Sequence, residues 1–151
     1  MAVQVRRILV CVQFNSSQPA TVRYACALAE RFNAEIHVLH VLEEMPEPDV
    51  AALSPDESIC ATEGEEAILN GVVPAEFEER LICRRSVGFG VPWMAIVRYA
   101  WEHEIDLIVL GPSHRSRLGR WFLGSLTDEV VHHAPCPVFV AAAGERSFPL
   151  A

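Results

Sequence analysis

Short apolar runs alternate with helix-spaced apolar residues along the 151-residue chain. Each continuous run is typical of a strand that is buried on both faces. Between the runs, apolar residues recur three and four positions apart, as in amphipathic helices. These runs predict strands at residues 8–12, 36–42, 107–110 and 138–143, and a rough alternation of apolar and polar residues predicts another strand at 80–87. The helical spacing predicts helices from about residue 19 to Asn33 and at residues 58–69, 92–103 and 126–133.

Alternating strands and helices imply right-handed crossovers, and therefore a parallel sheet with helices on both faces. We predict an α/β fold with one domain over residues 1–143 and a C-terminal tail at 144–151. In such sheets, ligands bind beyond the carboxyl ends of the strands, where the strand order reverses. The candidate ligand loops therefore follow the first and fourth strands, at residues 13–17 and 111–124.

The charged residues are unevenly distributed. All 12 basic residues are Arg and none is Lys, which excludes a P-loop lysine and Schiff-base chemistry. Any phosphate must then be held by backbone N–H groups, hydroxyls, His or Arg. Residues 43–79 hold 12 of the 20 acidic residues and no Arg, although the whole chain has a net charge of −8. We interpret this segment as an acidic, insertion-like part of a mildly basic domain.

Composition also argues against several kinds of partner. A pI near 5.2 is atypical of nucleic-acid-binding proteins, so no nucleic-acid partner is expected. No apolar run reaches the roughly 18 residues that a membrane span needs, and the first run is too short for a signal-peptide core. The five cysteines are odd in number and form no C-x-x-C pair, which favours reduced thiols. We therefore expect a cytoplasmic protein without a membrane partner.

Four stretches of the chain carry a family resemblance. They read ILVCVQFNSSQPA, IHVLHVLEE, VGFGVPWMAIVRYAWEHEIDLIVLG and GPSHRSRLGRWFLGSLTDEVVHHAPCPVFV, and they cover most of the chain outside the acidic segment. The last is the most specific, because Gly-Ser precedes a helix and Pro-Cys-Pro-Val enters a strand. These stretches resemble the universal stress protein family. The resemblance implies a nucleotide-binding-like fold of five parallel strands in the order 3-2-1-4-5. It also implies homodimers, often paired through the last strand.

One branch of that family binds ATP through the loop after the fourth strand. The loop reads Gly, two residues, Gly, nine residues and then Gly-Ser or Gly-Thr. Backbone N–H groups in such a loop bind phosphate without lysine. By resemblance, Gly111 and the pair Gly124 and Ser125 stand at its two ends, and Val41 stands where an aliphatic residue packs against adenine. The candidate cofactor is therefore ATP or another adenine nucleotide.

Two positions depart from the ATP-binding pattern. His114 replaces the middle glycine, and Gln13 replaces the Asp that ATP binders tend to carry after the first strand. A side chain at position 114 occupies space that phosphates need. Arg115 and its neighbouring arginines, in contrast, make the loop cationic, and guanidinium groups suit phosphate. The candidate nucleotide-binding residues are Gln13, Val41, Gly111, His114, Arg115, Gly124 and Ser125.

Structural interpretations of the same residues remain open. In one alternative, Ser125 caps the helix and contacts no phosphate, with Asp128 at the capping-box position. Likewise, an alternative role for Gly111 is to form the turn that leaves the fourth strand, without any contact to phosphate. The arginines of the loop can form a solvated basic surface, or they can pair with the acidic segment of the same or a partner subunit.

No metal site and no catalytic residue is predicted. His132 and His133 are explained by the dipole of the helix that they end, rather than as metal ligands together with Cys136. His37 and His40 are three positions apart on one strand, so their side chains face opposite sides of the sheet. No G-x-S-x-G motif is present to supply a nucleophile.

We therefore expect a cytoplasmic homodimer of the universal stress type. It would act in stress response as a regulatory or binding module, with protein partners and with weakened or absent ATP binding. The alternative function is adenine-nucleotide binding through the loop after the fourth strand. A weak ATPase ranks last, because the sequence offers no general base near the expected phosphates.

Overall fold

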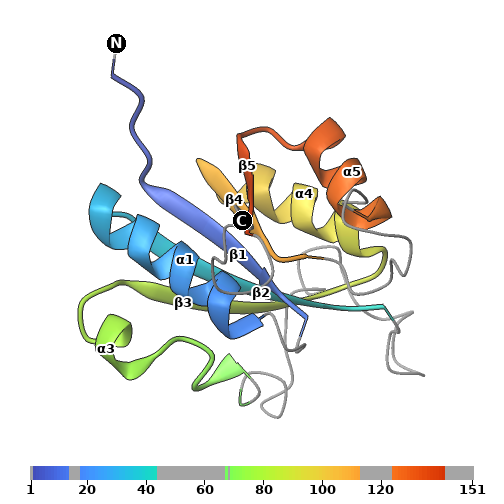
Figure 1. Cartoon of the computed structure of the whole chain (residues 1–151). Helices are drawn as coiled ribbons and strands as arrows, with labels where there is room; N and C mark the ends of the chain where they lie inside the picture. Colours follow the sequence, from blue (N-terminus) through green and yellow to red (C-terminus); the bar gives the residue numbers. More distant parts are fainter. Residues whose placement is uncertain (1, 14–17, 44–66, 68, 113–123, 142–151) are drawn as a thin grey trace, which may run out of the picture.

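A computed structural model describes residues 2–13, 18–43, 67, 69–112 and 124–141. Its strands are β1 (Arg7–Val12), β2 (Glu35–Leu42), β3 (Cys83–Phe89), β4 (Leu107–Leu110) and β5 (Val138–Val140). Its helices are α1 (Gln18–Phe32), α3 (Ala75–Glu78), α4 (Pro92–Glu102) and α5 (Ser125–His133). The strands form one parallel sheet in the order β3-β2-β1-β4-β5 (Figure 1). The predicted fold class is confirmed.

The core has two layers, one on each face of the sheet. Successive side chains of a strand point to opposite faces, so the apolar runs supply both layers. Ile8 and Val10 of β1 pack on the face that α1 covers, together with Val22 of that helix. Leu9 packs on the other face with Ile96 of α4. The two helices α1 and α4 lie on opposite faces of the sheet (Figure 1). All these side chains are at most 1% exposed, which explains why the strands lack the polar alternation of a half-exposed sheet.

The segment before β3 differs from the prediction. β3 begins at Cys83 rather than at Arg80, because residues 80–82 complete a turn that leaves the short helix α3. The backbone N–H groups of Arg80 and Leu81 both donate to the carbonyl oxygen of Phe77, at 3.0 and 2.9 Å. β5 likewise ends at Val140, earlier than predicted. Of the helix predicted at 58–69, only residues 67 and 69 are described, and both are helical.

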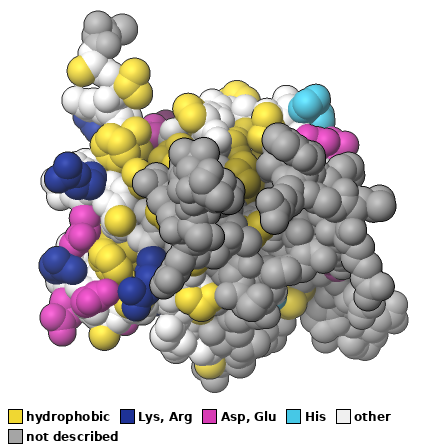
Figure 2. All heavy atoms as spheres, viewed as in Figure 1, with side chains coloured by type: hydrophobic (Ala, Val, Ile, Leu, Met, Phe, Trp, Pro, Cys, Tyr) yellow, Lys and Arg dark blue, Asp and Glu magenta, His cyan; other side chains and the backbone are white. Residues whose placement is uncertain are grey.

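Ion pairs join elements on the surface around α1 and α3. Arg80 pairs with Glu30 of α1 at 2.9 Å, and Arg85 of β3 pairs with Glu78 of α3. Figure 2 shows basic and acidic side chains close together on the left of this face, with apolar side chains between them. Exposed ion pairs contribute only about 0–1 kcal/mol each, so the apolar layers account for most of the stability.

The described cysteines behave as core residues. Cys11 and Cys26 are buried, Cys83 and Cys136 are half-buried, and all four are free thiols. Burial raises the pKa of Cys26 to about 12 and that of Cys136 to about 11, so both thiols are protonated at neutral pH. This agrees with their interpretation as small hydrophobic residues. Within the described parts of the chain, no helix is long and apolar enough to cross a membrane.

Candidate functional site

Three strands end side by side at one edge of the sheet, which we call the carboxyl edge. Gln13 directly follows β1, Gly111 directly follows β4, and Val41 is the second-last residue of β2. β1 lies between β2 and β4 in the sheet. The structure therefore brings together three of the candidate residues that are distant in sequence, at the edge where parallel sheets bind ligands.

Val41 offers an aliphatic surface at this edge. It packs against the apolar layer on the α4 face but remains only half-buried. Its register partner on β3 is Gly88, which has no side chain to cover it. Val41 is therefore suited to the predicted contact with the flat apolar face of an adenine ring.

Gly111 is required by its packing against α1. A Cβ atom at this position would lie 2.6 Å from the Oγ1 atom of Thr21, closer than Cβ atoms in folded proteins approach a non-bonded atom. Thr21 is itself 3% exposed and has little room to move. This contact gives a packing reason for glycine at this position that needs no ligand.

The start of α5 differs from the prediction. Ser125 is the first helical residue and not the cap, and the N-cap is Gly124, with φ 83° and ψ 155°. No side-chain hydrogen bond caps this helix, so the predicted capping by Ser125 and the capping box with Asp128 are both wrong. The physical reason is that Gly124 turns the chain into the helix with a backbone conformation that residues with a Cβ rarely adopt.

This helix start has the polarity of an anion-binding site. The N–H groups of the first turn carry partial positive charge and receive no side-chain cap. Ser125 adds an exposed hydroxyl group. Asp128 lies in the same turn, and its carboxylate reduces the positive potential there. The start of α5 therefore attracts an anion less strongly than it would without Asp128.

The rest of the candidate loop lies outside the described residues, including His114 and Arg115. Their predicted roles stay predictions. In the described ranges, no group of three or more His, Cys, Asp or Glu residues is arranged to hold a metal ion. His133 instead donates from Nδ1 to the Glu129 carbonyl oxygen at 2.8 Å, and its ring lies 4.6 Å from that of Trp93.

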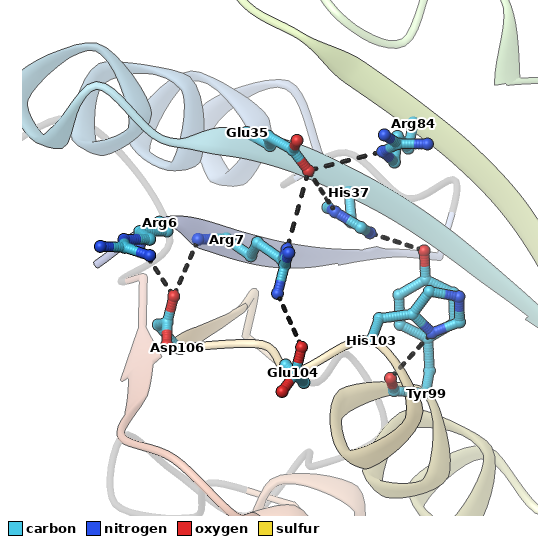
Figure 3. A network of polar contacts seen from close by, with 9 residues as sticks. All are labelled: Arg6, Arg7, Glu35, His37, Arg84, Tyr99, His103, Glu104 and Asp106. Carbon is cyan, nitrogen blue, oxygen red and sulfur yellow. Dashed lines mark hydrogen bonds and ion pairs between the residues drawn. The ribbon is translucent and has the colours of Figure 1, made fainter. Parts of the chain in front are cut away.

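The opposite end of the sheet, which we call the amino edge, contains a network of ion pairs and hydrogen bonds (Figure 3). The Asp106 carboxylate accepts hydrogen bonds from the backbone N–H groups of Arg6 and Arg7, at 2.8 and 3.0 Å. The Arg7 guanidinium pairs with Glu104 at 3.2 Å and approaches Glu35 to 3.9 Å. Strand β1 is thereby tied at its start to β2 and to the α4–β4 turn.

Glu35 joins this network to a buried histidine. His37 is 2% exposed and lies between the Glu35 carboxylate, 3.3 Å from Nε2, and the Tyr99 hydroxyl, 2.7 Å from Nδ1 (Figure 3). Because a carboxylate only accepts, Nε2 of the neutral ring carries the hydrogen and Nδ1 accepts from Tyr99. Burial lowers the pKa of His37, and the positive charge of Arg84 adds to this, against the opposing effect of Glu35.

Sequence reasoning assigned no site role to two residues of the carboxyl edge. Thr21 packs against Gly111, and His40 of β2 approaches the end of β1, with Nδ1 2.9 Å from the Val12 carbonyl oxygen. No motif marks either residue. The one available signal was strand alternation, which placed His40 and His37 on opposite faces, as the structure confirms through their different partners.

Comparison with known proteins identifies the family. The model of the universal stress protein family matches residues 4–142. The chain belongs to the universal stress protein family. A universal stress protein of Methanocaldococcus jannaschii is 29% identical over 138 residues, which cover 89% of this chain and 81% of that protein. A universal stress protein of Mycobacterium tuberculosis is 25% identical over 153 residues, and the chain spans only 50% of its length.

Solved structures share the fold. A hypothetical protein has a TM-score of 0.73 at 22% identity, covering 95% of this chain and 100% of its own. A universal stress protein of Archaeoglobus fulgidus in complex with dAMP has a TM-score of 0.62 at 18% identity over 92% and 98% of the two chains. A universal stress protein in complex with cAMP has a TM-score of 0.62 at 19% identity over 93% and 99%.

Proposed function

We propose that this protein is a stress-response module that binds an adenine nucleotide at its carboxyl edge and acts without turnover. The supporting observation is the convergence of Gln13, Val41 and Gly111 on neighbouring strand ends. Helix α5 also starts at this edge, since it returns the chain from the end of β4 to the start of the parallel strand β5. The ligand class is suggested by members of the same fold that bind cAMP and dAMP.

In this proposal, Val41 contacts the base and the start of α5 faces a phosphate. Ser125 adds a hydroxyl group there, and His114 and Arg115 are the proposed loop contacts. Affinity for ATP is weakened relative to family members with the intact motif. The causes are Gln13 in place of Asp, His114 in place of glycine, and the carboxylate of Asp128 in the first turn of α5.

Native mass spectrometry of the purified protein tests this proposal, together with thermal-shift titrations of ATP, ADP and AMP. A ligand that binds only the folded state raises the melting temperature by linkage. We expect a concentration-dependent increase with adenine nucleotides that guanine nucleotides do not reproduce. No co-purified nucleotide and no shift at about 1 mM nucleotide would overturn the proposal and favour a module that acts through protein partners alone.

We further propose that two copies pair through β5. This strand is at the edge of the sheet, and edge strands offer unpaired backbone groups to a second chain. Phe139 of β5 is 38% exposed and Tyr24 beside it is 44% exposed, with ring centroids 6.2 Å apart. Light scattering should give a dimer mass, and Phe139→Glu should give a monomer. Ile82→Glu, a change at another exposed apolar residue, is the control and should stay dimeric.

The cytoplasm is the proposed compartment, in keeping with the free thiols. The absence of turnover is tested by phosphate release from ATP. Release that is measurable and disappears in Gly124→Asp would favour a weak ATPase instead.

A further inference from the structure

The last two residues of β1 are paired on one side only. Its pairing with β4 stops at Val10 opposite Val109, and its pairing with β2 stops at Val12 opposite His40. Gln13 follows without a register partner on either strand and is exposed. A ligand residue in this place needs another means of positioning, because main-chain pairing does not reach it.

His40 supplies a side-chain bond at this point. Its Nδ1 lies 2.9 Å from the carbonyl oxygen of Val12, the last residue of β1. A carbonyl oxygen only accepts, so Nδ1 of His40 carries the hydrogen and donates it. His37, three residues earlier on β2, has the opposite tautomer when neutral, because its Nδ1 accepts from the Tyr99 hydroxyl.

The bond links two candidate contacts of the nucleotide. Val12 directly precedes Gln13, and His40 directly precedes Val41. Because successive strand residues face opposite sides, His40 reaches the end of β1 from one side of the sheet while Val41 faces the other. This side-chain bond adds to the main-chain pairing of β1 with β2 at Val12, the point from which Gln13 leaves the sheet beside Val41.

We propose that His40 is a positioning residue of the nucleotide site. It holds the end of β1 through Nδ1–H donation to Val12, and so fixes Gln13 relative to Val41. The inference rests on the proposed function for its effect on affinity, whereas its structural part can be measured without any nucleotide.

The structural part is tested by NMR. At about pH 8, where histidines are neutral, ¹⁵N shifts should show the hydrogen of His40 on Nδ1. Amide hydrogen exchange at Val12, the last paired residue of β1, should be faster in His40→Leu than in wild type. It should be near the wild-type rate in His40→Asn, whose amide N–H can replace Nδ1–H. His133→Leu is the matched control. It removes an Nδ1–carbonyl contact of 2.8 Å in α5 and should leave exchange at Val12 unchanged.

The binding part uses calorimetric titration with AMP. His40→Leu should bind about 3- to 10-fold more weakly, the effect of one hydrogen bond, while His40→Asn and His133→Leu bind within about twofold of wild type. If wild type binds no nucleotide, the proposed function fails, and the NMR results alone decide whether His40 positions Gln13. Three results would overturn the inference: equal weakening in both His40 variants, unchanged affinity in His40→Leu, or unchanged amide exchange at Val12 in His40→Leu.

Discussion

The two ends of the sheet are built from the same strands but differ in how their polar groups are satisfied. At the amino edge, Asp106 accepts two backbone N–H groups, and Glu35 is surrounded by Arg7, Arg84 and His37 (Figure 3). Both carboxylates there already have hydrogen-bond or ion-pair partners. The described part of the carboxyl edge instead ends in an exposed amide, a half-buried valine and a helix start without a side-chain cap.

This difference suggests that polar side chains stabilise the fold at the amino edge and are available to a ligand at the carboxyl edge. The amino edge ties β1 to its neighbours through side chains that satisfy one another, so it leaves little capacity for a ligand. The carboxyl edge holds its strands by close packing, as at Gly111 and Thr21, and by the bond from His40. Changes at the amino edge should therefore alter the free energy of unfolding without altering nucleotide affinity. Changes at the carboxyl edge should alter affinity.

The largest effect on stability is expected for Gly111→Ala. The new methyl group would meet Thr21 Oγ1 at 2.6 Å, and such overpacking costs about 2–3 kcal/mol. Urea denaturation measures the loss. Because the clash involves one atom of Thr21, the added change Thr21→Ala should recover part of the stability, so that the double variant is more stable than the sum of the single losses predicts. Strict additivity would contradict the packing explanation.

Asp106→Ala should have the next largest effect. It leaves the backbone N–H groups of Arg6 and Arg7 without their carboxylate acceptor, at a cost of about 1–2 kcal/mol in the free energy of unfolding. Asp106→Asn keeps an acceptor oxygen and should lose less. Both variants should bind AMP as wild type does, and a parallel loss of affinity would show that the two edges are not independent.

A smaller, pH-dependent effect is expected at His37. Its pKa is lowered from 6.5 in the folded protein, mainly by burial, so the unfolded chain binds protons first as the pH falls through 6.5. The stability that His37 contributes is therefore complete above that pH and is lost below it. His37→Gln should flatten this part of the pH profile of unfolding, measured between about pH 7.5 and 5.5. The exposed His132→Gln serves as the control and should retain the wild-type slope.

The smallest effect is expected for Glu104→Gln. Its partner Arg7 lies 3.2 Å away, but the Glu104 side chain is 83% exposed. Water screens such a pair, so the free energy of unfolding should fall by less than about 0.5 kcal/mol. A larger loss would mean that the amino-edge network acts as a coupled unit rather than as separate pairs.

The fold was predictable because most strands leave a largely apolar run, as at residues 107–110, whereas β3 left only rough alternation and its start was misplaced. The site was only partly predictable. The resemblance identified Gly124 and Ser125, but the helix and its cap begin one residue earlier than predicted, because Gly124 takes the positive-φ cap position that was assigned to Ser125. His40 was missed as a site residue because its role depends on strand register, which sets the carbonyl group that its ring reaches.

Calorimetric titration of AMP into wild type, Gly124→Ala and Gly124→Asp tests the central claim most directly. Both substitutions strain the backbone at φ 83°, but only aspartate adds a negative charge at the start of α5. The account predicts that wild type binds, that Gly124→Ala binds measurably and that Gly124→Asp, while still folded by circular dichroism, does not bind. Equal affinity in folded Gly124→Asp and Gly124→Ala would contradict a phosphate bound at this helix start.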